Sequence, residues 1–246
     1  MDISKIQPIQ NEPALFIKEK KILVIADLHI GIESELKEHG VNTESQTQKI
    51  LNHFISICKK HKPETIIILG DIKHNIPTST IQERNDVKNF LNQIKDIAKV
   101  YIVPGNHDGN IAWIKPEEIT IQPSDGFCIE NVGFVHGHRW PSKQVISSDQ
   151  VITAHTHPTI MLTDRLEHKT FEPCWIKGKF IKKKIEEKYK IKSNAEVLFI
   201  PAFNPLCGGI AVNKDGIMGP IGKLLEISEL EIYLLDGTSL GAIKNL

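Results

Sequence analysis

Five short apolar segments of this sequence are each followed by side chains that can bind a metal ion. Residues 22–26, 65–69, 100–102, 132–135 and 151–154 are rich in Ile, Val and Leu, as β-strands are. The polar residues that follow these segments are Asp27, His29, Asp71, Asn106, His107, Asp108, His136, His155 and His157. Mixed imidazole and carboxylate groups are typical ligands of manganese, iron, zinc or nickel. Five such strand ends in one chain predict a metal centre.

Each motif alone has a simpler interpretation. The Asn-His-Asp turn at 106–108 is compatible with an ordinary loop, and Asp27 is compatible with a cap of the helix that follows it. A single histidine is more often a core residue than a ligand. His155 and His157, however, alternate along the chain and so point to one side, where two buried imidazoles without a ligand would be costly. The recurrence of the pattern favours the metal centre.

The segments between the first three motifs predict how these motifs are brought together. A helix-compatible segment, 33–58, separates the first two strands, and a second one, about 80–98, separates the next two. The second segment has apolar residues at helical spacing, namely Val87, Phe90, Leu91, Ile94 and Ile97. Strands that alternate with helices form a parallel sheet with right-handed crossovers, and the carboxyl ends of its strands share one crevice. The first three motifs are therefore expected to converge.

Shorter strands complete the predicted fold. Residues 14–17 and the lysine-rich turn 18–21 are expected to form a hairpin with the first strand. After the third motif the sequence has short apolar segments joined by Gly and Pro turns, at 119–121, 127–130, 132–135 and 151–154. This pattern predicts a second, mixed sheet. Its histidines are expected to face the ligands of the first sheet across the crevice.

The number of polar residues at the strand ends indicates two metal ions. Two Asp, one Asn and four or five His are more ligands than one ion takes when it must also hold water and substrate. Two ions about 3.5–4 Å apart that share a bridging carboxylate use such a set in displacement reactions at phosphorus. The four cysteines form no Cys-x-x-Cys pair, so free thiols in a reducing compartment are expected, with Cys128 as the one thiol near the motifs.

The complete series of motifs resembles a known family. In order, the chain has Asp-x-His at 27–29, Gly-Asp at 70–71, Gly-Asn-His-Asp at 105–108, His136, and His-x-His at 155–157. Over roughly residues 22–157 this resembles the calcineurin-like metallophosphoesterases. The resemblance implies an α/β fold in four layers, an αββα sandwich with two central mixed β-sheets. One departure is Ala154, which stands where the family has Gly; because this position gives no ligand, only a small backbone adjustment is expected.

The resemblance also implies a role for each motif residue. His107 would stabilise the transition state and protonate the leaving oxygen, with its ring oriented by Asp108. The nucleophile would be a hydroxide that bridges two divalent metal ions, with Mn²⁺ as the first expectation and Fe, Zn or Ni as alternatives. The implied ligands are Asp27, His29 and His157 for the first ion, Asn106, His136 and His155 for the second, and Asp71 as the bridge.

Within the family, segments 27–31, 70–74 and 136–141 are similar to an archaeal and bacterial group related to recombination-repair nucleases. This implies a phosphodiesterase or nuclease acting on DNA, RNA or nucleotides, with a repair helicase or ligase as a partner. His74 and Arg139 are candidate phosphate contacts, although surface or supporting roles fit them equally well. The alternatives are a phosphomonoesterase of phosphoproteins or small metabolites, a cyclic-nucleotide phosphodiesterase and a catalytically silent binding module. The intact pair at 107–108 disfavours the last of these.

Composition adds broad expectations about the whole chain. Its 246 residues are 40% hydrophobic with a formal net charge of zero, which predicts one domain, 1–246, without a general attraction to nucleic acid or membrane. The motifs occupy about 22–157, and 160–246 form a C-terminal elaboration, in which the turn 204–209 is a candidate border of the active site. The stretch from Lys177 to Lys192 is interpreted as a solvated face, with nucleic-acid binding as the alternative. With no leader-like segment and no apolar run near the roughly 18 residues of a membrane span, a cytoplasmic protein is expected. No feature indicates the oligomeric state.

Overall fold

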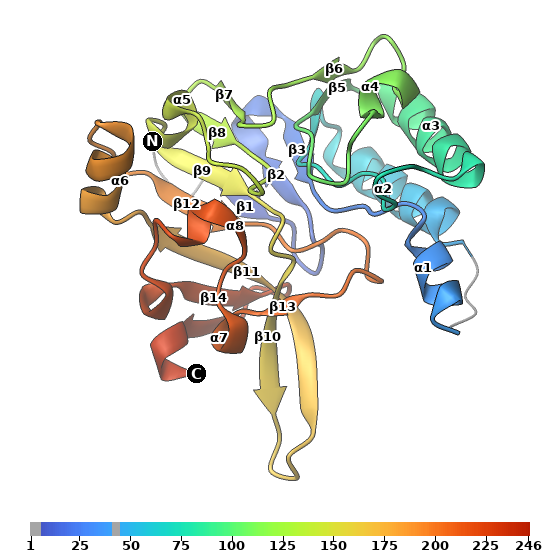
Figure 1. Cartoon of the computed structure of the whole chain (residues 1–246). Helices are drawn as coiled ribbons and strands as arrows, with labels where there is room; N and C mark the ends of the chain where they lie inside the picture. The colour runs from blue at the N-terminus through green and yellow to red at the C-terminus, as the bar shows by residue number, and fades with distance from the viewer. Residues whose placement is uncertain (1–5, 41–44) are drawn as a thin grey trace.

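The computed structural model describes residues 6–40 and 45–246 and has two β-sheets that lie face to face, with helices on the outside (Figure 1). The first sheet has six strands in the order β1-β2-β3-β4-β5-β6. They are β1 Ile6–Pro8, β2 Leu15–Ile17, β3 Ile22–Ile25, β4 Thr65–Ile68, β5 Lys99–Ile102 and β6 Thr120–Ile121. The strands from β3 to β6 are parallel, while β1 and β2 are antiparallel to their neighbours. The predicted hairpin and parallel sheet are confirmed.

In the described part of the chain, the second sheet has nine strands and is also mixed. Its order is β13-β10-β11-β12-β9-β8-β7, and β14 pairs with β11 and with β15. The strands are β7 Phe127–Ile129, β8 Val132–Phe134, β9 Gln150–Thr153, β10 Pro158–Thr163, β11 Lys169–Lys179, β12 Glu196–Phe199, β13 Ile210–Ala211, β14 Glu231–Leu234 and β15 Ser239–Ala242. The strand β9 is parallel to both of its neighbours, β8 and β12. The end of β9 therefore points the same way as the end of β8.

Helices cover the outer face of each sheet. They are α1 Ile32–Glu38, α2 Thr47–His61, α3 Ile81–Lys95, α4 Ile111–Ile114, α5 Lys143–Ile146, α6 Lys182–Tyr189, α7 Val212–Asp215 and α8 Gly219–Gly222, with 3₁₀ turns at Lys18–Lys20, Ile227–Glu229 and Ile243–Asn245. The helices α2 and α3 pack on the first sheet, while α5, α6 and α8 pack on the second. Among the described residues, none of the helices combines the length and the apolarity that crossing a bilayer requires.

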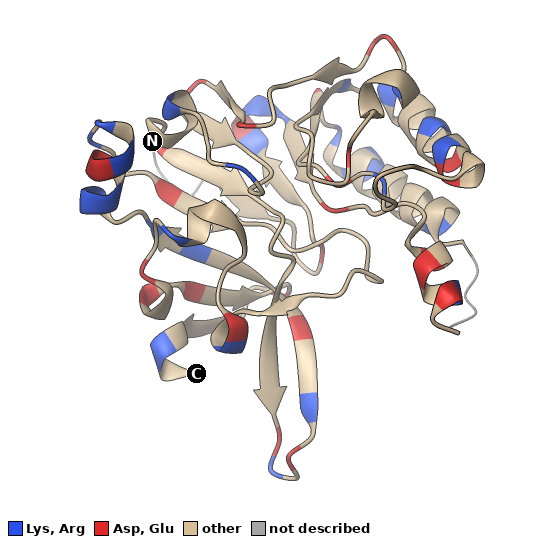
Figure 2. Ribbon diagram, in the orientation of Figure 1, with Lys and Arg blue, Asp and Glu red and all other residues tan. Residues whose placement is uncertain are grey.

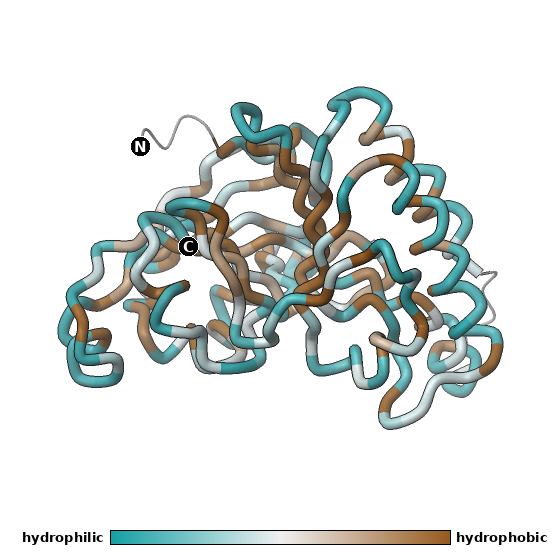
Figure 3. The backbone as a smooth tube through the Cα atoms, turned by 90° about the horizontal axis from the view of Figure 1, so that it is seen from above, coloured by the Kyte–Doolittle hydropathy of each residue, from teal (hydrophilic) through white to brown (hydrophobic). Residues whose placement is uncertain are grey.

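The continuous apolar strands have a simple physical reason, since both faces of each sheet are buried. In β4, Ile66 and Ile68 pack against the helices, whereas Ile67 and the following residue, Leu69, pack between the two sheets. The hydrophobic stretches accordingly gather in the middle of the molecule and the hydrophilic ones outside (Figure 3). This burial confirms the four-layer α/β sandwich with two mixed sheets that the sequence predicts.

Three details of the predicted elements are wrong. The segment 33–58 is not one helix but two, α1 and α2, and residues 41–44 within it lie outside the described part of the chain. Residues 120–121 form β6 and pair with β5 in the first sheet, because the chain leaves that sheet only after this edge strand. Ile97 lies after the end of α3 and is 36% exposed, so it does not continue the buried stripe of that helix.

The lysine-rich stretch from Lys177 to Lys192 contains the end of β11 and helix α6, whose basic residues lie at one edge of the molecule (Figure 2). Its two aromatic side chains, Phe180 and Tyr189, are only 5% and 7% exposed and belong to the core of the second sheet. They are therefore not available to stack on nucleic-acid bases. This agrees with the interpretation of a solvated face.

Candidate metal centre

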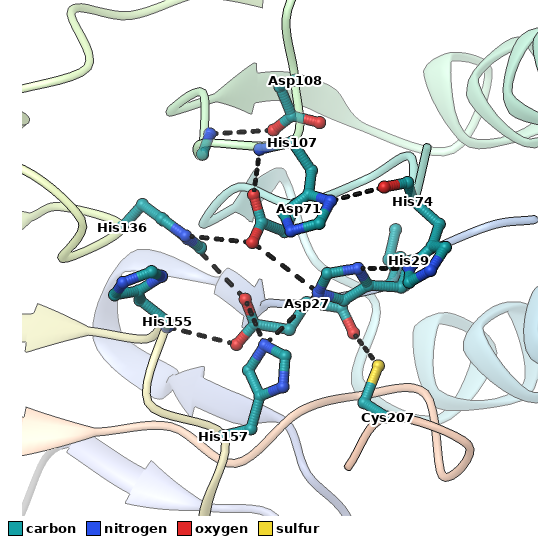
Figure 4. Close-up of polar contacts among 12 residues, drawn as sticks. Asp27, His29, Asp71, His74, His107, Asp108, His136, His155, His157 and Cys207 are labelled. Atoms are coloured by element: carbon teal, nitrogen blue, oxygen red, sulfur yellow. Dashed lines mark hydrogen bonds and ion pairs between the residues drawn. The ribbon is translucent and has the colours of Figure 1, made fainter. Parts of the chain in front are cut away.

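The carboxyl ends of β3, β4, β5, β8 and β9 meet at one place, so strand ends from both sheets form a single cluster of side chains (Figure 4). Two overlapping groups there have ligand atoms within 4.8 Å of one another. The first group contains Asp27, His29, Asp71 and His157, and the second contains Asp71, His136 and His155. Six of the seven residues that the sequence predicts as ligands therefore lie in these two groups.

The backbone at this cluster is unusual. Asp27, His29, Asp71, His155 and His157 all have positive φ angles, between 40° and 69°, a region that side-chain-bearing residues rarely adopt. Such strain persists only where the surrounding structure holds it, and it is concentrated at functional sites. Five strained residues in one cluster therefore make the cluster a candidate functional site.

Two glycines permit this close approach. A Cβ atom at Gly70, whose φ is +73°, would lie 2.5 Å from Nδ1 of His136, and one at Gly105 would lie 2.1 Å from Oδ1 of Asp71. Real Cβ atoms do not approach other heavy atoms this closely. The Gly-Asp and Gly-Asn-His-Asp motifs thus need glycine because their backbones touch the ligands of neighbouring strands.

In the first group, two imidazoles face each other across a short gap. The Nε2 atoms of His29 and His157 are 3.3 Å apart, and Oδ1 of Asp27 lies 3.4 Å from Nε2 of His157. Two nitrogens that each lie about 2.0–2.1 Å from one metal ion are roughly 2.8–3.4 Å apart at bond angles of 90–109°. The Nδ1–H of His157 donates to the carbonyl of Gly208 at 3.0 Å, which leaves Nε2 free as a ligand atom.

In the second group, His136 is completely buried and held in the same manner. Its Nδ1–H donates to the carbonyl of Leu69 at 2.7 Å, so Nε2 is the atom left to bind a proton or a metal ion. That Nε2 lies 3.4 Å from Oδ2 of Asp71. The ring of His155 lies beside it, with ring centroids 5.0 Å apart.

The Asp71 carboxylate belongs to both groups. Its Oδ1 accepts a hydrogen bond of 2.8 Å from the backbone N–H of His107, which fixes the orientation of the carboxylate. Its Oδ2 lies 3.6 Å from Nε2 of His29 and 3.4 Å from Nε2 of His136. One oxygen atom therefore lies between the two groups.

The cluster fits metal ions, because it contains buried polar atoms that the protein itself does not satisfy. Oδ1 of Asp27 and Nε2 of His136 are both buried and have no hydrogen-bond partner among the described residues. An unpaired buried carboxylate oxygen is costly, and a cation beside it removes that cost. Nε2 of His136, which faces the oxygen of Asp71, likewise needs a proton or a metal ion between the two atoms.

The pKa values of the histidines divide them into two classes. Burial lowers the pKa of His29 to about 3 and the pKa of His155 to about 4, so both rings are neutral at pH 7. Burial also acts on His136, but the carboxylates of Asp71 and Asp27 outweigh it and raise its pKa to about 9. Neutral imidazoles are the form that binds metal, and a protonated His136 must lose its proton to do so.

The seventh predicted ligand, Asn106, lies exposed on the turn after β5 and makes no hydrogen bond to another described residue. Its neighbour His107 reaches the cluster, with its ring centroid 4.7 Å from that of His29. The His107 Nδ1 contacts the carbonyl oxygen of His74 rather than Asp108. The expectation that Asp108 orients the His107 ring directly is therefore wrong.

Asp108 acts instead on the backbone. The side chain is 3% exposed, and it accepts hydrogen bonds from the N–H groups of Ile72 at 2.8 Å and Gly105 at 2.9 Å, with a longer one from Lys73 at 3.4 Å. Burial is the main reason that the pKa of this carboxyl is raised. The carboxylate ties the turn that carries His107 to the end of β4, and so positions it indirectly.

The two predicted phosphate contacts lie in different places. The His74 ring is occupied: its Nδ1 lies 3.1 Å from Nδ1 of His29, and its Nε2 contacts the carboxylate of Glu35 on α1. Arg139 is exposed and lies on the far side of the second group, next to His138. His74 thus supports a metal ligand, and only Arg139 is free to meet a substrate.

Cys207 is the cysteine nearest to the ligand cluster, whereas the sequence indicates Cys128 as the thiol near the motifs. The Sγ of Cys207 lies 3.6 Å from the carbonyl oxygen of Asp27. It also lies within 4.8 Å of a ring nitrogen of His29 and of His157. Cys128 lies in β7 and packs against the core of the second sheet. The turn 204–209 borders the site as expected, but no sequence signal connects Cys207, 180 residues from Asp27, with the first motif.

Comparison with known proteins identifies the family of this chain. The family model for calcineurin-like phosphoesterases matches residues 20–206, and the chain belongs to that family of hydrolases, whose members typically bind divalent metal ions. The crystal structure of the nuclease MPE from Pseudomonas putida is similar over 96% of this chain and 100% of that chain, with a TM-score of 0.61 and 21% identity. The phosphoesterase YfcE from E. coli covers 89% of this chain and 96% of its own, with a TM-score of 0.40 and 11% identity.

Proposed function

We propose that this protein is a phosphodiesterase that uses two divalent metal ions to hydrolyse phosphodiester bonds in nucleic acid or nucleotides. The observation that carries the proposal is the Asp71 carboxylate, whose Oδ2 lies within 3.6 Å of a histidine nitrogen from each ligand group. A carboxylate shared by two groups of ligands is the arrangement of two-metal sites that act on phosphorus.

The residues that would hold the ions are those of the two groups. Asp27, His29 and His157 would hold the first, His136 and His155 the second together with Asn106, and Asp71 would belong to both. Mixed nitrogen and oxygen donors favour Mn²⁺, with Fe, Zn or Ni as the other ions of this chemistry. When bound, such ions supply positive charge at the phosphoryl oxygens and lower the pKa of water.

His107 is proposed as the general acid. Its Nδ1 contacts the carbonyl of His74, so Nδ1 carries the hydrogen and Nε2 is the atom left to face the substrate. When the ring is protonated, Nε2 can give its proton to the leaving oxygen as the phosphorus–oxygen bond breaks. Asp108 assists by holding the turn, since its carboxylate binds the backbone on both sides of it.

A diester substrate is favoured by the motif segments 27–31, 70–74 and 136–141, which resemble repair-type nucleases, and by the nuclease among the similar folds. The phosphomonoesterase and the catalytically silent binding module are the alternatives. A repair helicase or ligase as partner, a role in DNA repair and a cytoplasmic location stay predictions. So does the single domain spanning 1–246.

The test is hydrolysis of bis(p-nitrophenyl) phosphate and p-nitrophenyl phosphate with Mn²⁺. We expect the diester to be preferred, and we expect His107→Ala and Asp71→Asn to lose at least 100-fold in rate. The exposed residues His168 and Asp215 supply matched controls, because His168→Ala and Asp215→Asn lie outside the cluster and should match the wild type. Preference for the monoester would contradict the proposal and show that the protein is a phosphomonoesterase. Two bound metals without turnover of either ester would favour the binding module.

A further inference from the structure

A wide hollow of about 970 Å³ opens beside the second ligand group and is not used by the proposed mechanism. We call it the side pocket; its walls come from residues 123–125, 138–140, 219–220 and Lys223. The ring of His138, which lines it, has its centroid 5.2 Å from that of His136 and 6.1 Å from that of His155. The side pocket therefore borders the place where the scissile phosphate would lie.

The side pocket presents positive charge and hydrogen-bond donors. Arg139 and Lys223 are exposed in its wall, and neither side chain pairs with a carboxylate of the described residues. Asp125 is the one acidic residue in the described wall, so the two cations leave a net positive charge. Nδ1 of His138 is buried there without a hydrogen-bond partner among the described residues. Unpaired cations next to an unsatisfied polar atom suit an anionic group of a ligand.

The wall of the side pocket is held in place before any ligand binds. The hydroxyl of Tyr189 donates to the carbonyl of Pro141 at 2.9 Å, and the N–H of Ser142 donates to the carbonyl of Asp125 at 2.8 Å. The Nζ of Lys188 lies 3.4 Å from the ring centroid of Trp140, which fixes the indole by a cation–π contact. Trp140 is nevertheless 38% exposed, so part of its ring can meet a base.

We propose that the side pocket binds the nucleotide next to the scissile bond, with its phosphate on Arg139 and Lys223 and its base against Trp140. This rests on the proposed function and narrows it, because a substrate that reaches the side pocket is a strand of nucleic acid rather than a compact phosphate ester. An aromatic ring beside cations is the usual means of holding an unpaired strand. The side pocket thus determines the substrate class, while the metal centre determines the reaction.

The test separates strand binding from chemistry by using the double variant Arg139→Ala with Lys223→Ala. Binding of fluorescein-labelled oligothymidylate is measured by anisotropy in EDTA, where no cleavage occurs. We expect the Kd to rise at least tenfold, and the slope of log Kd against log salt to fall by about 0.7 for each phosphate that the variant no longer neutralises. The matched control is Arg165→Ala with Lys169→Ala, on the β10–β11 hairpin that projects away from the site (Figure 1), which should leave the Kd unchanged.

A second measurement uses the small diester, which has no neighbouring nucleotide. With Mn²⁺, Lys223→Ala alone should hydrolyse bis(p-nitrophenyl) phosphate within twofold of the wild type, while its KM for the oligonucleotide rises. Wild-type Kd values for oligothymidylate in the double variant would overturn the inference. So would an equal loss on both substrates, because that would mean damage to the metal centre. A wild type that hydrolyses neither substrate would instead overturn the proposed function.

Discussion

The Nδ1 atoms of His29 and His74 lie 3.1 Å apart, although 45 residues separate them in the sequence. If His29 binds the first metal through Nε2, its Nδ1 carries the hydrogen and donates to His74. The Nε2 of His74 then donates to the carboxylate of Glu35, so a chain of hydrogen bonds runs from helix α1 to the metal ligand. His74 is further held by Glu83, whose Oε1 accepts its backbone N–H at 2.8 Å.

This chain predicts that Glu35 tunes metal binding without touching the metal. Glu35→Ala should weaken binding of one of the two Mn²⁺ ions by about 10–100-fold, because partners behind a ligand typically contribute that much. Glu35→Gln, which still accepts a hydrogen bond, should restore part of the affinity. Calorimetric titration measures both sites, and Glu38→Gln on the same helix is the control. Equal affinities in all four proteins would contradict the chain.

Gly105→Ala should abolish metal binding at the shared position, because its Cβ would lie 2.1 Å from Oδ1 of Asp71. Displacing that carboxylate also breaks its hydrogen bond with the N–H of His107. We expect at least one metal per protein to be lost, measured by elemental analysis after gel filtration. Gly109→Ala is the matched control, since nothing lies within 4 Å of its Cβ. Full metal occupancy in Gly105→Ala would contradict this prediction, because it would show that the turn can move without displacing the Asp71 carboxylate.

Asp108→Asn should destabilise the protein and lower its rate of turnover. The carboxylate accepts backbone N–H groups on both of its oxygens, and an amide must turn its NH₂ toward one of them. The unmet hydrogen bond costs about 1–3 kcal/mol, measurable by urea unfolding, and turnover should fall at least tenfold as the His107 turn loosens. The control Asp215→Asn, at an exposed carboxylate, should stay within about 0.5 kcal/mol of the wild type. Unchanged stability and rate would remove the positioning role.

Metal uptake should become weaker as the pH falls below about 9. In the metal-free protein the pKa of His136 is about 9, since the carboxylates of Asp71 and Asp27 outweigh the effect of burial. At lower pH a metal ion must displace that proton, so the apparent affinity should fall by up to about tenfold per pH unit. Titrating EDTA-treated, dialysed protein with Mn²⁺ at pH 7, 8 and 9 tests this. An affinity independent of pH over that range would refute it.

Cys174 should make the protein less stable in strong alkali. Burial raises the pKa of this thiol from 9.0 to about 12, so the unfolded chain loses the proton before the folded one does. Stability is therefore full below pH 9 and declines between about 9 and 12, by about 1.4 kcal/mol per pH unit. From pH 8.5 to 10.5 the wild type should lose about 2 kcal/mol more than Cys174→Ala in urea unfolding. Parallel losses in the two proteins would contradict this.

The sequence by itself determined the layered fold and the meeting of the motifs. Apolar runs such as 65–69 are local signals of strands buried on both faces, and strand–helix alternation brings parallel strand ends together. The break between α1 and α2 and the pairing of β6 with β5 were missed. The pattern of apolar and polar residues does not distinguish one long helix from two, nor one neighbouring sheet from another.

Tertiary structure alone decided the partners of the polar groups. The sequence pairs His107 with its neighbour Asp108, whereas the fold turns Asp108 to the backbone and brings the His74 carbonyl to the ring. Glu35 and Cys207 belong to no sequence motif. Glu35 nevertheless contacts His74, 39 residues away, and Cys207 contacts Asp27, 180 residues away. Hydrogen bonds act over about 3 Å, so they depend on how distant segments pack, which residue types and spacing do not specify.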